Sequence, residues 1–193
     1  MQIIEGLPEQ FRVQAAQLYW EAFSDKLGKI LGPDTRGTAY FADILVPEKA
    51  IAALSDDGET LLGLAGFDLG DGGVIGGGYK EIARHYGYFG GLWRGIVMEM
   101  FTRKVTPETL QMDGITASAD ARGQGVGTAL LEAIFEKAKT SGLKYVMLDV
   151  IDTNPRAKSL YERKGFSLLK TEHIGPLKWL FGFEKAYKMR KVV

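Results

Sequence analysis

The second half of the chain alternates between strand and helix patterns, and this alternation restricts the possible folds more than any other feature. Leu110 to Ser118 and Tyr145 to Val150 are apolar runs expected of strands, and Phe166 to Leu169 resumes a strand pattern. Val126 to Thr140 is amphipathic at helical spacing, and Asn154 to Gly165 has the cap residue and early proline of a second helix. The order strand, helix, strand, helix, strand predicts an α/β or α+β domain with helices packed on a sheet.

The first half of the chain adds elements of both kinds. Apolar residues recur at helical spacing in Pro8 to Ile30, and Thr35 to Leu45 is expected to form a shorter helix. Ile51 to Leu54 and Thr60 to Asp68 have strand patterns on either side of an Asp-Asp-Gly turn, and Met1 to Glu5 is a candidate for a further short strand.

Gly70 to Thr106 departs from this regular pattern. It starts with a run of glycines, and Tyr79 to Val105 then carries aromatic residues on a stretch expected to be helical. Such a long segment between two strands is unusual, because short links are the rule there. Two interpretations stay open: a packed insertion with a small core of its own, or a lid or wall over a substrate pocket.

Composition sets limits on partners and on chemistry. The 193 residues contain 24 Lys plus Arg and 24 Asp plus Glu, so no overall charge favours nucleic acid or an anionic membrane. The lack of cysteine excludes a disulfide framework and a cysteine nucleophile, and no residues have metal-ligand spacing. We therefore expect one cytoplasmic domain spanning residues 1–193, without a metal, nucleic-acid or membrane partner.

Neither an export signal nor a membrane span is expected from the apolar segments. Met1 to Gln10 lacks a basic start followed by an apolar run. The most apolar stretch, Tyr86 to Phe101, is interrupted by Arg94 and Glu99 and is shorter than the roughly 18 apolar residues that a spanning helix needs.

A glycine-rich turn, Ala119 to Gly127, joins the first of these later strands to its helix. The start of a helix leaves backbone N–H groups without partners, and these groups attract an anion. No Ser, Thr, Asp or Asn stands just before the helix to cap it, while Arg122 and the hydroxyl of Thr128 could add hydrogen bonds to a phosphate. The turn is therefore a candidate phosphate site.

Two other phosphate motifs fit this turn less well. The Walker A pattern needs Gly-Lys followed by Ser or Thr, and the turn has no lysine. The dinucleotide fingerprint would use Gly123 and Gly125, but Thr128 stands where its third glycine belongs. A tight turn that binds nothing also remains open from these residues alone.

The turn and a segment about 25 residues further on together resemble the GNAT family, the Gcn5-related N-acetyltransferases. Arg122, Gly125 and Gly127 match the family's cofactor motif. The downstream segment supplies the other matching residues: Asn154, Tyr161, Gly165 and Phe166. The resemblance covers roughly Leu110 to Leu169, and the insertion departs from the family pattern. It implies a central mixed sheet that is splayed between two parallel strands and has helices on both faces.

The resemblance also implies where acetyl-CoA binds. Its pantetheine arm would lie between the two splayed strands, with Asn154 contacting it from one side, although an asparagine before proline is also a good helix cap. The pyrophosphate would lie on the glycine-rich turn. The implied contacts are the backbone of Ile115, Thr116 and Ala117 for the arm, and Arg122, Gly123, Gln124, Gly125, Val126, Gly127 and Thr128 for the pyrophosphate.

The chemistry implied is direct transfer of the acetyl group to an amine. Tyr161 resembles the family's general acid, which protonates the departing sulfur. The alternative is that its ring only packs between helix and sheet. Asp113 shares a strand face with Gln111 and is the candidate base, directly or through a water. The alternative is a carboxylate that lies on the surface or stabilises a turn. His173 follows the last predicted strand and could reach a pocket, but a lone histidine more often has a structural role.

The leading hypothesis is thus an N-acetyltransferase acting on a small-molecule or peptide amine. The alternatives are a transferase for another acyl-CoA or acceptor, and a non-catalytic CoA-binding sensor. The apolar segment Gly175 to Phe183 is a candidate for the acceptor pocket, for a homodimer contact or for buried core. Lys188, Arg190 and Lys191 are expected to form a solvated end.

Overall fold

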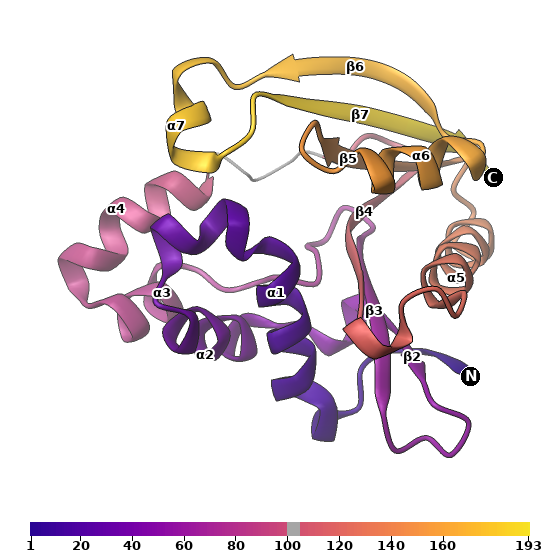
Figure 1. Cartoon of the computed structure of the whole chain (residues 1–193), viewed down its shortest axis with the longest axis horizontal. Coiled ribbons are helices and arrows are strands. Elements are labelled where there is room, and N and C mark those ends of the chain that lie inside the picture. Colours follow the sequence, from indigo (N-terminus) through magenta and orange to yellow (C-terminus); the bar gives the residue numbers. More distant parts are fainter. Residues whose placement is uncertain (100–104) are drawn as a thin grey trace.

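A computed structural model describes residues 1–99 and 105–193 of the chain. Seven strands and seven α-helices lie in these residues (Figure 1). In chain order they are β1 (Gln2–Glu5), α1 (Arg12–Leu31), α2 (Asp34–Ile44), β2 (Ala50–Leu54), β3 (Leu61–Asp68), α3 (Tyr79–Tyr86), α4 (Tyr88–Glu99), β4 (Thr109–Ala117), α5 (Val126–Thr140), β5 (Tyr145–Ile151), α6 (Pro155–Arg163), β6 (Ser167–His173), α7 (Lys178–Phe181) and β7 (Lys185–Val192).

The strands form one mixed sheet in the order β1-β2-β3-β4-β5-β7-β6. All neighbours are antiparallel except β4 and β5, which are parallel. The sequence prediction of a mixed sheet carrying helices is confirmed.

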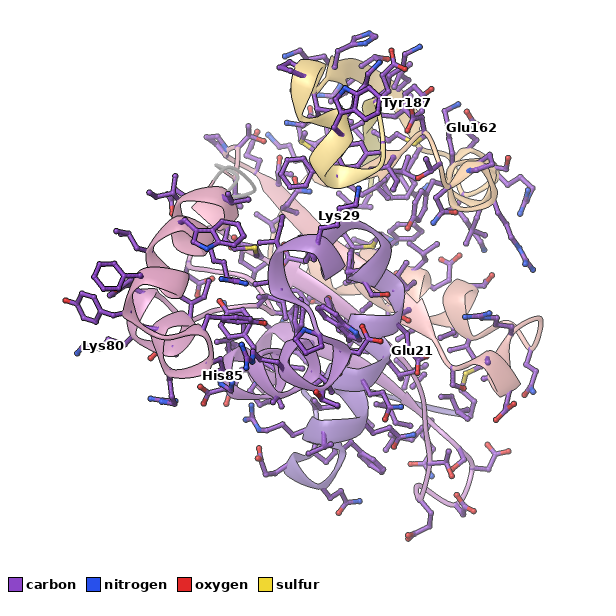
Figure 2. All side chains as sticks on the ribbon, turned by 60° about the vertical axis from the view of Figure 1, so that its left-hand side comes forward. Glu21, Lys29, Lys80, His85, Glu162 and Tyr187 are labelled. Atoms are coloured by element: carbon purple, nitrogen blue, oxygen red, sulfur yellow. The ribbon has the colours of Figure 1, made fainter. Side chains whose placement is uncertain are left out.

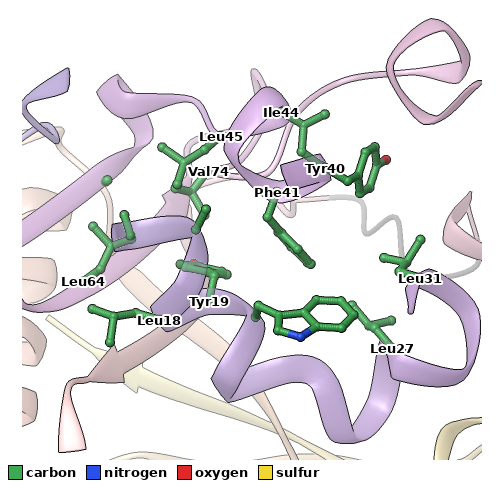
Figure 3. Packing of buried hydrophobic residues seen from close by; sticks show 14 of the residues in the cluster. Leu18, Tyr19, Leu27, Leu31, Tyr40, Phe41, Ile44, Leu45, Leu64 and Val74 are labelled. Atoms are coloured by element: carbon green, nitrogen blue, oxygen red, sulfur yellow. The ribbon is translucent and has the colours of Figure 1, made fainter. Parts of the chain in front are cut away.

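Helices cover both faces of the sheet, as Figure 1 shows with α1 and α2 on one side of β3 and β4 and α5 on the other. Alternate residues of β2 enter two separate cores, because successive side chains of a strand point to opposite faces. Ala52 and Leu54 pack in the core that holds α1 and α2, which Figure 3 shows from close by, whereas Ile51 and Ala53 pack in the core that holds α5 and α6.

The insertion packs on the rest of the domain through α3. Ile82 and Tyr86 are buried in the core on the α1 side, where the rings of Tyr86 and Tyr40 meet edge to face. On α4, by contrast, Tyr88, Phe89 and other apolar side chains are exposed. The helix α3 is therefore packed, but in the main core of the domain rather than in a small core of its own, and residues 100–104 lie outside the described part of the chain.

The C-terminus corrects the prediction of a solvated end. Lys188, Arg190 and Lys191 belong to β7, which lies inside the sheet between β5 and β6. Met189, in the same strand, is fully buried. The strand before it is also longer than predicted, because β6 runs to His173 rather than ending at Leu169. None of the helices in the described residues is long and apolar enough to cross a membrane.

Candidate functional site

The two parallel strands at the centre of the sheet part along their length. β4 and β5 pair only at Thr109 with Tyr145, at Leu110 with Val146 and at Gln111 with Met147. Beyond this point β4 stays paired with β3 as far as Ala117, and β5 stays paired with β7 as far as Ile151. The sheet thus opens between two strands that run in the same direction.

A bulge in β4 coincides with the point of parting. Met112 pairs with Phe67 and Gly114 pairs with Gly66, so Asp113 is an extra residue without a counterpart in β3. A bulge of this kind bends its strand and increases the local twist. The bend turns the second half of β4 away from β5, and it sets Asp113 at the inner end of the opening.

The opening contains a cleft of about 330 Å³. Four of the predicted site residues line it, namely Asp113, Ile115, Asn154 and Tyr161. Walls come from β4, β5, α6, α1 and the end of α7. The full lining is Ala22, Phe23, Met112, Asp113, Gly114, Ile115, Leu148, Asp149, Val150, Ile151, Thr153, Asn154, Ala157, Tyr161, Phe181 and Gly182.

The glycine-rich turn lies where β4 leads into α5, outside the cleft lining (Figure 1). Gly123 and Gly125 have φ of +81° and +84°, a conformation that glycine adopts without strain. Gly125 is the N-cap of α5, and no side chain caps this helix. The first helical bond joins the amide of Ala129 to the carbonyl of Gly125, which leaves the preceding amides of the first turn to face outward.

The turn is also sterically open. A Cβ placed on Gly123, Gly125 or Gly127 would meet no protein atom within 4 Å. Gly127 has no positive φ, so neither backbone strain nor packing within the described residues explains why it lacks a side chain. The absence of a side chain is explained if another molecule approaches the backbone there.

The remaining residues of the turn differ in what they can offer. Arg122 is exposed, and Thr128 is partly exposed. Val126 is buried in the core, so only its backbone faces outward, and the side chain of Gln124 donates to the carbonyl of Asp120 within the turn.

The predicted arm-binding residues of β4 are fixed by their neighbours on one edge. Ile115, Thr116 and Ala117 pair with β3, and the hydroxyl of Thr116 donates to the carbonyl of Leu18 in α1. Their other edge faces the gap left by β5. A peptide-like chain entering the gap can therefore pair with this edge as an added strand would.

Tyr161 lies on α6 with 6% of its surface exposed. Its ring packs edge-on against Phe166, with 5.7 Å between the centroids. Burial raises the pKa of Tyr161 to about 12, because the charged phenolate would be poorly solvated there. The phenol is therefore neutral over the physiological range, and it can act as a hydrogen-bond donor in the cleft.

Asp113 has a structural contact as well as a place in the cleft. One carboxylate oxygen accepts a hydrogen bond of 2.9 Å from the amide of Val74, in the glycine-rich loop after β3. Gly73 lies so close to this carboxylate that a Cβ there would be 1.9 Å from the oxygen. The carboxylate thus holds the loop against β4, which is the alternative role that the sequence left open.

Asn154 caps α6, with its side-chain oxygen accepting a 3.1 Å hydrogen bond from the amide of Ala157. Capping and contact with a ligand are compatible, because Asn154 also lines the cleft. His173 is exposed at the end of β6 and does not line the cleft.

Three further lining residues with charged or aromatic side chains were not predicted individually. Asp149 of β5 carries a carboxylate, 3.4 Å from the side-chain nitrogen of buried Gln111. The sequence feature that could have identified Asp149 is its position as a charged residue inside an otherwise apolar strand. Phe23 of α1 and Phe181 of α7 supply rings. Nothing in the local pattern marks Phe23 as a site residue, whereas Phe181 belongs to the apolar segment that was a candidate for the acceptor pocket.

The apolar segment after β6 reaches the cleft through Phe181 and Gly182. It is held to α1 by a hydrogen bond of 2.9 Å from the Lys29 ammonium to the carbonyl of Trp179. Figure 2 shows Lys29 beneath the segment that carries α7. Phe181 and Gly182 thus line the cleft, while Phe181 and Phe183 are also part of the buried core, and whether the segment binds the acceptor stays a prediction.

Comparison with known proteins agrees with this geometry. Residues 13–166 match the model of the acetyltransferase (GNAT) family. A stretch of 75 residues is 33% identical to the Mus musculus protein described as "Probable N-acetyltransferase family 8 member 5". That stretch covers 38% of this chain and 33% of the relative, so the match spans about a third of the relative's length.

Solved structures share the fold at low identity. An N-acetyltransferase from Staphylococcus aureus Mu50 superposes with a TM-score of 0.66 at 15% identity, covering 99% of this chain and 100% of the other. An acetyltransferase from Bacillus anthracis str. Ames, solved in complex with acetyl coenzyme A, superposes with a TM-score of 0.50 at 17% identity, covering 75% of this chain and 61% of the other.

Proposed function

Because this chain belongs to the acetyltransferase (GNAT) family, we propose that it transfers an acetyl group from acetyl-CoA to a primary amine of a small molecule or peptide. The observation that carries the proposal is the parting of β4 and β5 after Gln111, with Tyr161 at the wall of the resulting cleft. The family sets the class of reaction, acyl transfer, and the cleft supplies a place for it.

The turn before α5 fits a diphosphate. Its glycines leave open space at the backbone, no side chain caps the helix, and the exposed guanidinium of Arg122 stands beside it. Amides of Gly125 to Thr128 would donate to the phosphate oxygens, and the helix dipole would favour their charge. Residues 123 and 124 would complete the cradle through their backbone.

The gap between the strands fits the amide-bearing arm that joins the diphosphate to the thiol. The free edge of Ile115, Thr116 and Ala117 offers backbone partners, and Asn154 stands on the opposite side of the cleft. The Bacillus anthracis acetyltransferase that shares this fold was solved in complex with acetyl coenzyme A, which supports acetyl-CoA as the ligand.

Acetyl-CoA, when bound, supplies the thioester whose acyl group is transferred. Asp113 receives the proton that the attacking ammonium must lose, because an alkyl ammonium with a pKa near 10 is not nucleophilic at neutral pH. Tyr161 donates a hydrogen bond to the sulfur as the carbon–sulfur bond breaks. The nitrogen loses its second proton as the amide forms, and the sulfur gains one: Tyr161 passes its own proton to the sulfur and takes the proton of the nitrogen, so a neutral thiol and a neutral phenol result.

Binding of CoA and release of thiol test the proposal together. Calorimetric titration should show CoA binding, and a panel of primary amines should include at least one that releases thiol from acetyl-CoA. If CoA neither binds to the protein nor stabilises it against heating, the whole proposal is contradicted. Faster turnover with longer acyl-CoAs than with acetyl-CoA would show that the acyl donor is a longer acyl-CoA. Tight CoA binding without transfer to any amine would favour a CoA sensor.

A further inference from the structure

Each of the two parting strands carries an aspartate at the inner end of the cleft. The paired part of β4 and β5 ends at Gln111 with Met147. Two residues further along each strand stand Asp113 and Asp149, and both line the cleft. The side-chain nitrogen of buried Gln111 lies 3.4 Å from a carboxylate oxygen of Asp149 and helps to orient it. Both strands therefore contribute a carboxylate where the sheet opens.

The two aspartates belong to the α1 face of the sheet, whereas Tyr161 belongs to the other face. The residues on either side of Asp149 in β5 pack in the core that holds α5 and α6, so its side chain points to the α1 face. Asp113 accepts its hydrogen bond from Val74, which packs in the core on the α1 side. Tyr161 packs in the α5–α6 core. The carboxylates are therefore on the side of the cleft opposite to the donor phenol.

Aromatic rings line this same side of the cleft. Phe23 comes from α1 and Phe181 from α7, and both pack in the core on the α1 side. A Cβ on Gly114 would lie 2.7 Å from the ring of Phe23, so a larger residue at position 114 would displace this ring. None of the described residues that line the cleft is Lys, Arg or His. The α1 side of the cleft thus offers two carboxylates and apolar surface.

Packed elements cover this side and limit the size of an acceptor. The hydrogen bond of 2.9 Å from Lys29 to the carbonyl of Trp179 attaches α7 to α1. An extended peptide would have to separate these two helices in order to lie across the carboxylates. The cleft of about 330 Å³ lies near the lower end of the volumes usual for small-molecule sites. A small acceptor is therefore favoured over a peptide.

The charges of the cleft distinguish between two classes of primary amine. A simple alkyl amine is a cation at neutral pH, and a carboxylate accepts strong hydrogen bonds from an ammonium group. An α-amino acid brings a carboxylate of its own together with the ammonium. That group would be placed beside Asp113 and Asp149 without a cationic side chain from the described lining residues, and like charges repel strongly in a partly buried site.

We propose that the acceptor is a small primary amine on an apolar group, without a carboxylate beside the nitrogen, and that Asp149 determines this preference. The proposal rests on the function proposed above, and Asp113 keeps its role as the base. Asp149 accepts a hydrogen bond from the ammonium before Asp113 takes the proton. The ring of Phe23 contacts the apolar group of the amine.

Pairs of acceptors that differ only by a carboxylate test the substrate class in the wild-type protein. The pairs are phenethylamine with phenylalanine, and pentylamine with norleucine. Thiol release from acetyl-CoA should show a kcat/KM at least about tenfold higher for the amine than for the amino acid of the same pair. A smaller ratio in both pairs, or faster reaction of the amino acids, would overturn the substrate class and leave the proposed acetyl transfer intact.

Asp149→Asn tests the residue that we hold responsible. It should lower kcat/KM for the better amine at least about tenfold and reduce the ratio between amine and amino acid at least about fivefold, with KM for acetyl-CoA within about threefold of the wild type. Asp56→Asn is the matched control, because Asp56 is exposed between β2 and β3 and does not line the cleft. Thermal unfolding verifies that both variants are folded. An unchanged ratio in Asp149→Asn would overturn the role of Asp149.

Amine binding without turnover separates this inference from the proposed function. Phenethylamine and pentylamine are titrated calorimetrically into protein with CoA present, which carries no acyl group. The wild type should bind at least one of them, and Asp149→Asn should bind it at least about tenfold more weakly. Such binding in a protein that acetylates no amine would uphold the ligand class of the cleft and reject the transferase. If neither amine binds or reacts, the inference is overturned, even if another acceptor is acetylated.

Discussion

At the scale of single residues, Tyr161 is held in the cleft by its ring. Its contact with Phe166 does not involve the hydroxyl, so Tyr161→Phe removes the donor and keeps the packing. We expect kcat to fall at least about a hundredfold, as is typical for loss of a general acid, with CoA affinity within about threefold of the wild type. Steady-state rates with the best amine, together with calorimetry, measure both quantities.

A Tyr161→Phe variant that keeps most of its kcat would show that the ring alone matters. A variant with equal losses in CoA affinity and in rate would indicate a damaged cleft instead. The Tyr40→Phe variant controls for loss of a buried phenol, since burial also raises the pKa of Tyr40 to about 12.

Residues that belong to a local motif could be predicted from the sequence, and residues that meet through packing could not. Asn154 and Tyr161 were predicted from the resemblance of one short segment to the family pattern, and both line the cleft. Phe23 reaches the cleft from α1, so its role depends on how two distant segments pack. The hydrogen bond between Asp113 and Val74 likewise depends on a loop that follows another strand.

At the scale of elements, a substitution at the start of α5 should change ligand binding without lowering protein stability. Gly127 is helical and open, so Gly127→Ala should leave the free energy of unfolding unchanged or raise it by up to about 0.5 kcal/mol, since alanine favours helix. The new methyl group should weaken CoA binding at least about tenfold, because it stands where the diphosphate would approach.

Gly95→Ala is the control for this change. Gly95 also lies in a helix, α4, and has no protein atom within 4 Å of its Cβ position. It should show a similar effect on stability and no effect on CoA affinity. If Gly127→Ala binds CoA as tightly as the wild type does, the turn does not hold the diphosphate.

The strand β7 shows why a charged segment can be missed as a strand. Lys188, Arg190 and Lys191 suggested a solvated end, but the charged groups of Arg190 and Lys191 lie over aromatic rings. The Arg190 guanidinium lies 4.6 Å from the centroid of Tyr145, and the Lys191 ammonium lies 5.1 Å from that of Phe135. Long cationic side chains often cover apolar surface in this way. The hydrophobic pattern alone does not reveal this packing.

At the scale of the whole molecule, buried phenols should make the fold sensitive to alkali. Burial raises the pKa of Tyr40, Tyr86 and Tyr161 to about 12 each, against 10.0 when unfolded. Between these values the folded chain holds protons that the unfolded chain has lost, so the free energy of unfolding falls as pH rises above about 10. Denaturant unfolding at pH values between about 8 and about 11.5 measures this decline in the free energy of unfolding.

Tyr161→Phe should make this decline shallower. Each pKa unit corresponds to about 1.4 kcal/mol, so the Tyr161 share approaches about 2–3 kcal/mol by about pH 12. Stability that stays flat to about pH 11 in the wild type, or equal slopes in the two proteins, would show that these phenols are not buried as described.

The sequence predicted more of the overall architecture than of its central opening. The alternation from Leu110 onward predicted β4, α5, β5, α6 and the start of β6, and the structure confirms these elements, whereas α7 and β7 were not predicted. The parting of β4 and β5 came only from the family resemblance. It depends on the bulge at Asp113, which is visible only in the register with β3.

The central claim is that CoA lies with its diphosphate on the α5 turn and its arm between β4 and β5. A crystal structure of the protein with CoA tests this claim most directly. We predict phosphate oxygens within hydrogen-bond distance of the amides of Gly125 to Thr128, and the thiol beside the hydroxyl of Tyr161. CoA bound elsewhere, or β4 and β5 closed against each other beyond Gln111, would contradict the account.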